Sequence, residues 1–286
     1  MSTTFSLRPA AVARRLARGE IYYAIGRFAR VRRGYSRLRA LLDWLPRNPS
    51  VPIESASLFP GLEPASTAAE LAREGIVCGL ALPDDILLEI ARFAEERPFR
   101  PLQGGPPVLR REVRGGRLPN GEPAVVGRVI APQDCPAVRR VAGDPALYAL
   151  ASRYLGYRPP IILSELHWSF VSDATSELRR KLGQTIDYHY DVGWFNFLYF
   201  FFYLTPVDRL SGAHAIIRRS HRRKPLSMLW HSARQPDEPV LRHYGPAAEL
   251  VVEGPAGTGF VEDASCFHKA LVPTAGERLA FFVRYG

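Results

Sequence analysis

The chain has 286 residues, a net charge of +10 and 47% hydrophobic residues, which suits one large domain with its own core and argues against global disorder. No run of about 18 apolar residues could span a membrane and no secretory signal is recognised, so neither a membrane-spanning nor a secreted protein is indicated. Three widely spaced cysteines, Cys78, Cys135 and Cys266, argue against a disulfide framework or a zinc ribbon, and we expect a cytoplasmic protein.

The first predicted element is a basic amphipathic helical segment, assigned to residues 1–46. Eleven arginines and only two acids lie in residues 1–50, so almost all of the net charge belongs to this end of the chain. Residues 10–45 are predicted to be helical, with breaks at Gly26 and Gly34. The prediction rests on one apolar stripe at helical spacing, formed by Ile21, Ile25, Phe28, Tyr35, Leu38 and Leu42.

Two roles for this segment are open. A basic amphipathic helix can lie on an anionic membrane, and residues 8–47 would then hold the protein peripherally at the inner membrane surface. The helix can instead pack on the protein's own domain and leave its arginines in solvent. Nucleic acid is not expected as a partner, because no base-stacking or groove-reading element accompanies the charge.

A linker and a mixed region follow the basic segment. Residues 47–66 are rich in Pro and Ser and are predicted to be a linker, which leaves residues 67–286 as the domain. The domain is expected to open with helices and a strand before the sheet region. The clearest of these are a strand at 75–82, a helix at 84–96 and a helix at 144–156.

From residue 160 onward, apolar runs of strand length alternate with turn residues. The runs are IILSELHWSFV, FNFLYFFFYL, GAHAIIRRS, AELVVEG, GTGFVED, KALVP and RLAFFVRYG. Many short strands divided by Gly and Pro predict a β-sandwich or barrel. Together with the earlier helices, this pattern predicts a mainly β, α+β fold with flanking helices.

One stretch, QTIDYHYDVGW, places a histidine and a carboxylate just before a greasy strand. His189 and Asp191 stand two residues apart, so on an extended backbone they face the same side and can bind one metal. His268, in EDASCFHKALVP, supplies a third ligand. Two histidines and one carboxylate form the facial triad of non-haem Fe(II) oxygenases, whose open positions suit a bidentate co-substrate and O₂. Arg278, at the start of the next strand, suits the far carboxylate of a 2-oxo acid.

With these residues in this order, the sequence resembles the phytanoyl-CoA dioxygenase family of Fe(II)/2-oxoglutarate oxygenases. The resemblance covers roughly residues 70–285 and rests on LAREGIVCGLALPDD, YHYDVGW, FFFYLTPVDRLSGAHAIIRRSHRRKPL and FHKALVPTAGERLAFFVRYG. It implies a double-stranded β-helix, a jelly-roll, cupin-like core, that follows a helical N-terminal segment. It also implies iron held by His189, Asp191 and His268, and 2-oxoglutarate held by Arg278.

The sequence departs from the family's pattern at a second anchor for 2-oxoglutarate. Many members carry a hydroxyl two residues after the distal histidine, where this chain has Ala270, and Tyr199 and Thr274 are the candidates to replace it. Three further residues are predicted to touch substrate because they flank or face the triad. They are His167, Trp194 and Asn196.

The function predicted from these residues is an Fe(II)/2-oxoglutarate-dependent dioxygenase. It would hydroxylate a small-molecule, lipid or glycolipid substrate with O₂ and release succinate and CO₂. One alternative is a metal-dependent hydrolase, because two histidines and a carboxylate also hold catalytic zinc. The other is a non-catalytic binding member of the same family, in which the basic helix carries the function.

Overall fold

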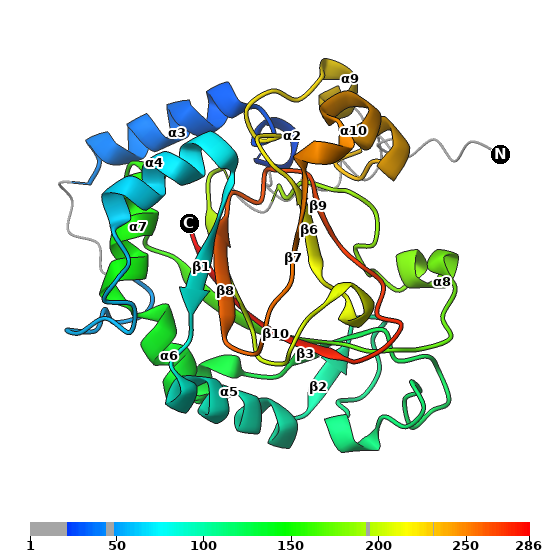
Figure 1. Cartoon of the computed structure of the whole chain (residues 1–286). Helices are drawn as coiled ribbons and strands as arrows, with labels where there is room; N and C mark the ends of the chain where they lie inside the picture. Colours follow the sequence, from blue (N-terminus) through cyan, green and yellow to red (C-terminus); the bar gives the residue numbers. More distant parts are fainter. Residues whose placement is uncertain (1–21, 44–48, 193–194, 231) are drawn as a thin grey trace.

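The computed structural model describes residues 22–43, 49–192, 195–230 and 232–286. Within these ranges, no helix is both long enough and apolar enough to cross a membrane. The strands form two antiparallel sheets, and helices lie outside them (Figure 1). The prediction of a mainly β chain with flanking helices is confirmed.

The larger sheet has seven strands in the order β1-β8-β5-β10-β4-β3-β2. Its strands are β1 (Ile76–Ala81), β8 (Thr258–Glu262), β5 (Leu198–Tyr203), β10 (Arg278–Tyr285), β4 (Ile162–Ser169), β3 (Val126–Val129) and β2 (Phe99–Pro101). The smaller sheet has the order β7-β6-β9, formed by β7 (Glu249–Val252), β6 (His214–Ile217) and β9 (His268–Ala270). Each apolar run predicted from residue 160 onward contains or overlaps one of these strands.

Strand β10 shows how the larger sheet is packed on both faces. Side chains alternate along a strand, so Phe281 and Tyr285 face one side and Ala280 and Phe282 face the other. The first pair belongs to the main core beneath the helices, whereas the second packs against the smaller sheet. Arg278 has the parity of Ala280 and therefore shares the inner face, between the two sheets. This alternation makes the inner face the natural place for a site.

Helices cover the outer face of the larger sheet (Figure 1). They are α4 (Pro64–Glu74), α5 (Asp84–Glu96), α6 (Pro136–Ala142) and α7 (Pro145–Leu155). In α5, Ile86, Ile90 and Ala94 recur every four residues and are completely buried, which gives the helix one apolar face. Asp144 caps α7 by accepting hydrogen bonds from the backbone N–H groups of Ala146 and Leu147. Three short helices, α8 (Ser176–Lys181), α9 (Leu226–Trp230) and α10 (Asp237–Tyr244), occupy connections.

The basic N-terminal segment is docked on the domain where the structure describes it. The predicted break at Gly26 separates α2 (Tyr22–Ile25) from α3 (Ala29–Leu41), but α3 runs through Gly34 without a break. Tyr35 packs against the main core and stacks on Phe195 at 4.9 Å between ring centroids. Leu38 and Leu41, by contrast, are 57% and 73% exposed, so only part of the predicted stripe is covered.

The arginines of α3 divide between its two sides. Arg30, Arg33 and Arg37 are exposed, as expected for a basic face. Arg32 points inward, and its side chain is only 12% exposed. The expectation that all these arginines form a solvated face was therefore wrong at Arg32, because that position lies on the docked side of the helix. Contact between the outer side and an anionic membrane stays a prediction.

The segment predicted to be a linker lies against the domain over its described part. Ser50 exchanges hydrogen bonds with Ile162 at the start of β4, and the Glu54 N–H donates to the Gly143 carbonyl at 2.8 Å. Phe59 is buried in the main core and stacks on Phe202. The helix that follows begins at Pro64, before the predicted boundary at residue 67. This Pro- and Ser-rich stretch is therefore a connection that packs against the domain over its described part.

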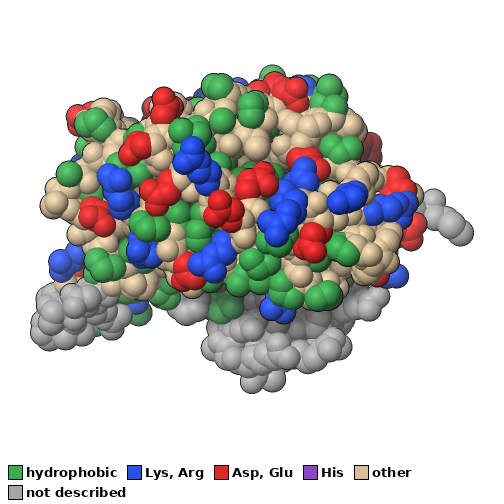
Figure 2. Space-filling view, turned by 90° about the horizontal axis from the view of Figure 1, so that it is seen from below, with side chains coloured by type: hydrophobic (Ala, Val, Ile, Leu, Met, Phe, Trp, Pro, Cys, Tyr) green, Lys and Arg blue, Asp and Glu red, His purple; other side chains and the backbone are tan. Residues whose placement is uncertain are grey.

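The surface over α5 carries mixed charge. Viewed from below the orientation of Figure 1, basic and acidic side chains lie next to one another with apolar groups between them (Figure 2). On this face there is no continuous area of one sign. The excess positive charge of the chain is accordingly a feature of its N-terminal part, as the composition indicates.

Candidate metal centre

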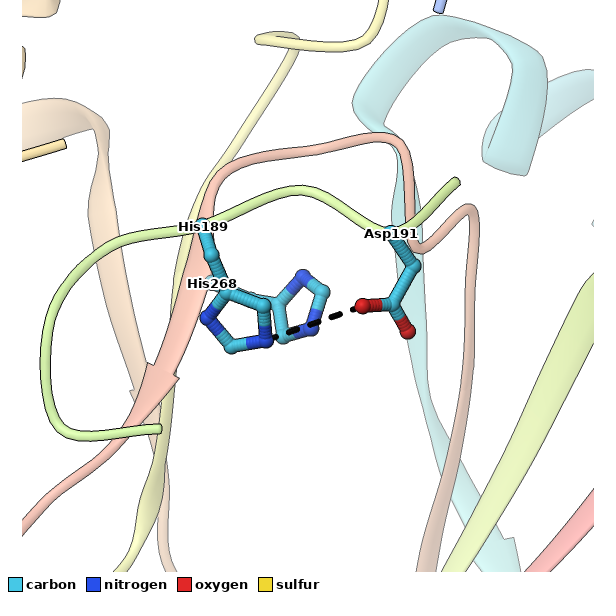
Figure 3. A group of neighbouring side chains, drawn as sticks. All are labelled: His189, Asp191 and His268. Atoms are coloured by element: carbon cyan, nitrogen blue, oxygen red, sulfur yellow. Dashed lines mark ion pairs between the residues drawn. The ribbon is translucent and has the colours of Figure 1, made fainter. Parts of the chain in front are cut away.

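Three side chains converge where the extended segment after α8 meets the beginning of β9. One ligand atom from each of His189, Asp191 and His268 can be chosen so that the three lie within 4.8 Å of one another. The Nε2 atom of His189 is 3.7 Å from the Oδ1 atom of Asp191 (Figure 3). Among the described residues this is the group of this kind that could hold a metal ion.

Backbone pairing brings the three residues together. The N–H of His189 donates to the carbonyl of His268 at 2.9 Å, and the N–H of His268 donates back at 2.8 Å. The N–H of Asp191 donates to the carbonyl of Ala264 at 2.8 Å. The backbones of all three residues are therefore fixed by main-chain hydrogen bonds between segments far apart in the sequence. These bonds bring the three side chains close together.

Each histidine ring is oriented by a carbonyl two residues earlier in the chain. Nδ1 of His189 lies 3.2 Å from the Asp187 carbonyl, and Nδ1 of His268 lies 3.0 Å from the Cys266 carbonyl. A carbonyl only accepts, so each Nδ1 carries the proton and each Nε2 has a free lone pair. Metal-binding histidines are commonly held in this way.

The electrostatics of the group also suit a cation. Burial, with the neighbouring His268, holds the pKa of His189 well below its usual value, so the ring is neutral and able to bind metal. Burial raises the pKa of Asp191, although His268 and Arg284 act against the rise. A carboxylate that is costly to ionise alone is stabilised by a divalent cation. The geometry and the neutral ring of His189 thus both fit a metal ion.

Arg278 lies at the start of β10 and is buried. It donates to the Gly212 carbonyl through Nη1 and to the Ser169 hydroxyl at 3.3 Å through Nη2. Its Nε has no hydrogen-bond partner, and no carboxylate pairs with the guanidinium among the described residues. Burial lowers the pKa of Arg278. A buried cation without an anion is costly, so the site favours a ligand that brings a carboxylate.

Two further buried residues lie between Arg278 and the triad, and of these Glu262 was missed in the sequence analysis. His214 on β6 stacks on His268, with 5.4 Å between ring centroids, and its Nε2 is 2.7 Å from Oε2 of Glu262 on β8. Burial raises the pKa of Glu262 to about 8, and burial with the charge of Arg278 lowers the pKa of His214 to about 3. The two side chains are therefore bonded to one another in a buried environment that disfavours charge on either group. The sequence offered one indication of Glu262: it stands two residues after Phe260 on the same strand, so both side chains face the inside of the domain.

The two predicted second anchors for 2-oxoglutarate do not lie beside Arg278. Tyr199 pairs in register with Arg284, and burial and Asp191 raise the pKa of its phenol, so it lies at the metal end. Arg284 is six residues along β10 from Arg278, which is roughly 20 Å. Thr274 is exposed and donates to the Leu210 carbonyl at 3.4 Å. Thr274 was wrong as an anchor, because it lies in a solvent-exposed turn. Tyr199 lies at the other end of the strand from Arg278, and its role as an anchor for 2-oxoglutarate stays a prediction.

The predicted substrate residues have different surroundings. His167 on β4 shares the inner face and packs on Phe282, and its Nε2 is 2.9 Å from Oε2 of Glu165. Its role in lining the site stays a prediction. The amide of Asn196 is occupied by Arg32 and Ser36 of α3. Its assignment to substrate was wrong, because the docked helix takes both ends of the amide. Trp194 lies outside the described residues.

No protein-family model matches the sequence, and no curated protein matches it. EctD from S. alaskensis, solved with bound Fe, is 16% identical and has a TM-score of 0.52, with 84% of this chain and 83% of that chain covered. EvdO2 from Micromonospora carbonacea var. aurantiaca is 13% identical with a TM-score of 0.51, over 77% of this chain and 89% of that chain.

HygX from Streptomyces hygroscopicus was solved with nickel, 2-oxoglutarate and hygromycin B bound. It is 13% identical, with a TM-score of 0.50, over 78% of this chain and 86% of that chain. At such low identities these likenesses concern the fold. The chain therefore has the jelly-roll fold with flanking helices that these proteins share.

Proposed function

We propose that this protein is an Fe(II)/2-oxoglutarate-dependent oxygenase. The observation that carries the proposal is the alignment of two groups on one inner face. A His–Asp–His cluster lies at one position, and a buried guanidinium that pairs with no described carboxylate lies at another. A 2-oxo dicarboxylate is the ligand that satisfies both, because one end chelates the metal and the other neutralises the arginine. EctD and HygX, which share the fold, were solved with bound Fe and with nickel and 2-oxoglutarate, respectively.

In this proposal the residues of the chain hold the metal and 2-oxoglutarate and shield them from water. His189, Asp191 and His268 would hold Fe(II), and Arg278 would hold the far carboxylate of 2-oxoglutarate. The bound iron would supply oxidative decarboxylation of 2-oxoglutarate to succinate and CO₂ with O₂. Aromatic side chains wall the inner face against water, and the ring of Phe201 contacts those of both Phe260 and Phe282.

We infer hydroxylation of a small-molecule, lipid or glycolipid substrate as the outcome, as in the phytanoyl-CoA dioxygenase family that the sequence resembles. The polar part of the inner face supports a substrate with hydrogen-bonding groups. Oε2 of Glu165 there lies 2.9 Å from Nε2 of His167, and Nε of Arg128 lies 3.2 Å from the same nitrogen. These three side chains are half-buried or exposed, so a substrate can reach them.

The two alternatives predict different properties of the same cluster. A zinc hydrolase needs no 2-oxo acid, and a buried arginine lacking an anion would serve it no purpose. A non-catalytic binding protein needs no intact triad. The proposal of an oxygenase uses both features, and for this reason we favour it.

The test is binding followed by turnover. The purified protein, loaded with Fe(II) without oxygen, should bind 2-oxoglutarate in calorimetry only when the metal is present. Admission of O₂ should then yield succinate, slowly without substrate. If the metal binds and 2-oxoglutarate does not, the oxygenase proposal fails, and Zn(II)-dependent hydrolysis of model esters would favour the hydrolase.

A further inference from the structure

The N-terminal helix α3 reaches the wall of the metal centre through one buried arginine. Nη2 of Arg32 lies 2.9 Å from both carboxylate oxygens of Asp263, whose side chain is 3% exposed. The same guanidinium donates to the amide oxygen of Asn196 at 2.9 Å through Nη2 and at 3.2 Å through Nε. Arg32 therefore joins two segments, one of which follows Asp191 along the chain and one of which precedes His268.

Asp263 shapes the turn that leads to the distal histidine. Its Oδ1 accepts from the N–H of Ser265 at 2.9 Å, and its carbonyl accepts from the N–H of Cys266 at 2.7 Å. The carbonyl of Cys266 in turn accepts from Nδ1 of His268. The neighbour of Asp263, Ala264, accepts from the N–H of Asp191. Two of the three proposed ligands thus depend on the position of this one turn.

The Asp263 carboxylate has few other means of holding its position. Apart from Arg32 and the turn itself, it accepts a hydrogen bond from the Tyr154 hydroxyl of α7 at 2.6 Å. No second cation pairs with it among the described residues. Loss of Arg32 would leave a buried carboxylate without counter-charge, which is strongly unfavourable. The turn would then move to expose Asp263 to water, and the Cys266 carbonyl would move with it.

We propose that Arg32 is a positioning residue for the metal centre, so that docking of α3 sets the affinity of the triad for its metal. The proposal rests on the metal centre described above. It gives the N-terminal segment a role that its basic composition does not suggest. The face of α3 that carries Arg32, Tyr35 and Ser36 acts as part of the active-site wall, while Arg30, Arg33 and Arg37 remain in solvent.

The experiment measures binding of Co(II) alone to the full chain, by calorimetry and by the visible absorption of the bound ion. Arg32→Met removes the cation and keeps the length of the side chain, and Arg33→Met is the matched control on the exposed side of the same helix. Removal of a group that orients metal ligands typically costs about 10- to 100-fold in affinity. We expect a loss in that range for Arg32→Met, with an altered Co(II) spectrum, and wild-type values for Arg33→Met. Arg32→Lys should lie between them.

Two further variants keep the result decisive. His268→Ala must lose Co(II) binding, and if it does not, the proposed metal centre itself is wrong. If wild type binds, His268→Ala does not, and a folded Arg32→Met binds with wild-type affinity and spectrum, Arg32 only tethers the helix and the inference is overturned. Should Arg32→Met fail to fold, Tyr154→Phe and Arg32→Lys decide, because both weaken the hold on Asp263 while leaving α3 in place. Unchanged Co(II) affinity in both would overturn it as well.

Discussion

His189 and His268 are paired through their main chains by two hydrogen bonds, and their ring centroids lie 4.2 Å apart. The pairing joins an extended segment after α8 to the beginning of β9. The rings are thereby placed side by side before any metal arrives, with each Nδ1 bonded to a carbonyl. Preorganisation of this kind means that a variant of one ligand should change metal binding much more than folding.

We expect His189→Ala, Asp191→Ala and His268→Ala each to abolish 2-oxoglutarate turnover. Each removes one of three ligands that act as a unit, so the losses should not add. Succinate formation at saturating Fe(II) and the melting temperature should be measured together. The control is His243→Ala, which is exposed, lies outside the cluster and should keep activity. Wild-type succinate formation by any triad variant would sink the assignment.

Arg278→Ala should raise the KM for 2-oxoglutarate while leaving Co(II) affinity within a few-fold of wild type. The guanidinium is buried and would pair with a carboxylate, and truncation of one partner of such a pair costs about 2–5 kcal/mol. Arg284→Ala is the informative comparison, because Arg284 has the same strand parity and lies beside Tyr199 at the metal end. If Arg284→Ala raises the KM and Arg278→Ala does not, the wrong arginine has been assigned.

Lowering the pH should reduce the free energy of unfolding, in part through protonation of Asp263. Burial alone would raise the pKa of this carboxyl, but Arg32, His221 and the Tyr154 hydroxyl outweigh it and hold the pKa below its usual value. A folded-state pKa below the unfolded value means that the stabilisation is fully present above about pH 4 and is lost as the pH falls toward the folded value. Over that range Asp263 should contribute a slope of up to about 1.4 kcal/mol per pH unit.

Urea unfolding at several pH values below 5 checks this slope. Asp263→Asn has no titrating group there, so its free energy of unfolding should fall less steeply than that of wild type, although it starts lower. Arg32→Met should flatten the slope as well, and Arg33→Met should keep it. Parallel curves for wild type and Asp263→Asn between pH 5 and 3 would contradict the prediction.

Gly75→Ala should destabilise the domain by about 2–4 kcal/mol. Gly75 ends α4 with a φ of +84°, and an added Cβ would lie 2.4 Å from Sγ of Cys266 and 2.7 Å from Nδ1 of His221. Gly121 has the same φ of +84° but open space around it, so Gly121→Ala should cost only about 1–2 kcal/mol of strain. Equal melting temperatures of the two variants would show that the clash near Cys266 relaxes.

The sequence by itself determined the strands of the jelly roll and the candidate ligands. Apolar runs between turn residues are local patterns that indicate strands. Such strands are commonly buried between two layers of the fold. The spacing of His189 and Asp191 places them on one side of an extended chain, wherever that chain lies. Arg278 shares its strand parity with Arg284, and it was preferred because it lies at the start of the strand and at the spacing that the family resemblance implies. The structure brings the three candidate ligands together as expected.

Only the tertiary structure decided which polar residues share a site. Arg32 looked like one more arginine of a basic helix, yet it pairs with an aspartate 231 residues away. Asn196, next to the triad in sequence, is held by α3, and His214 meets Glu262 across the two sheets. Such pairings depend on how helix and sheets are placed against one another. Local spacing carries no information about a partner from a distant segment, because the free energy that selects it comes from burial in the folded chain.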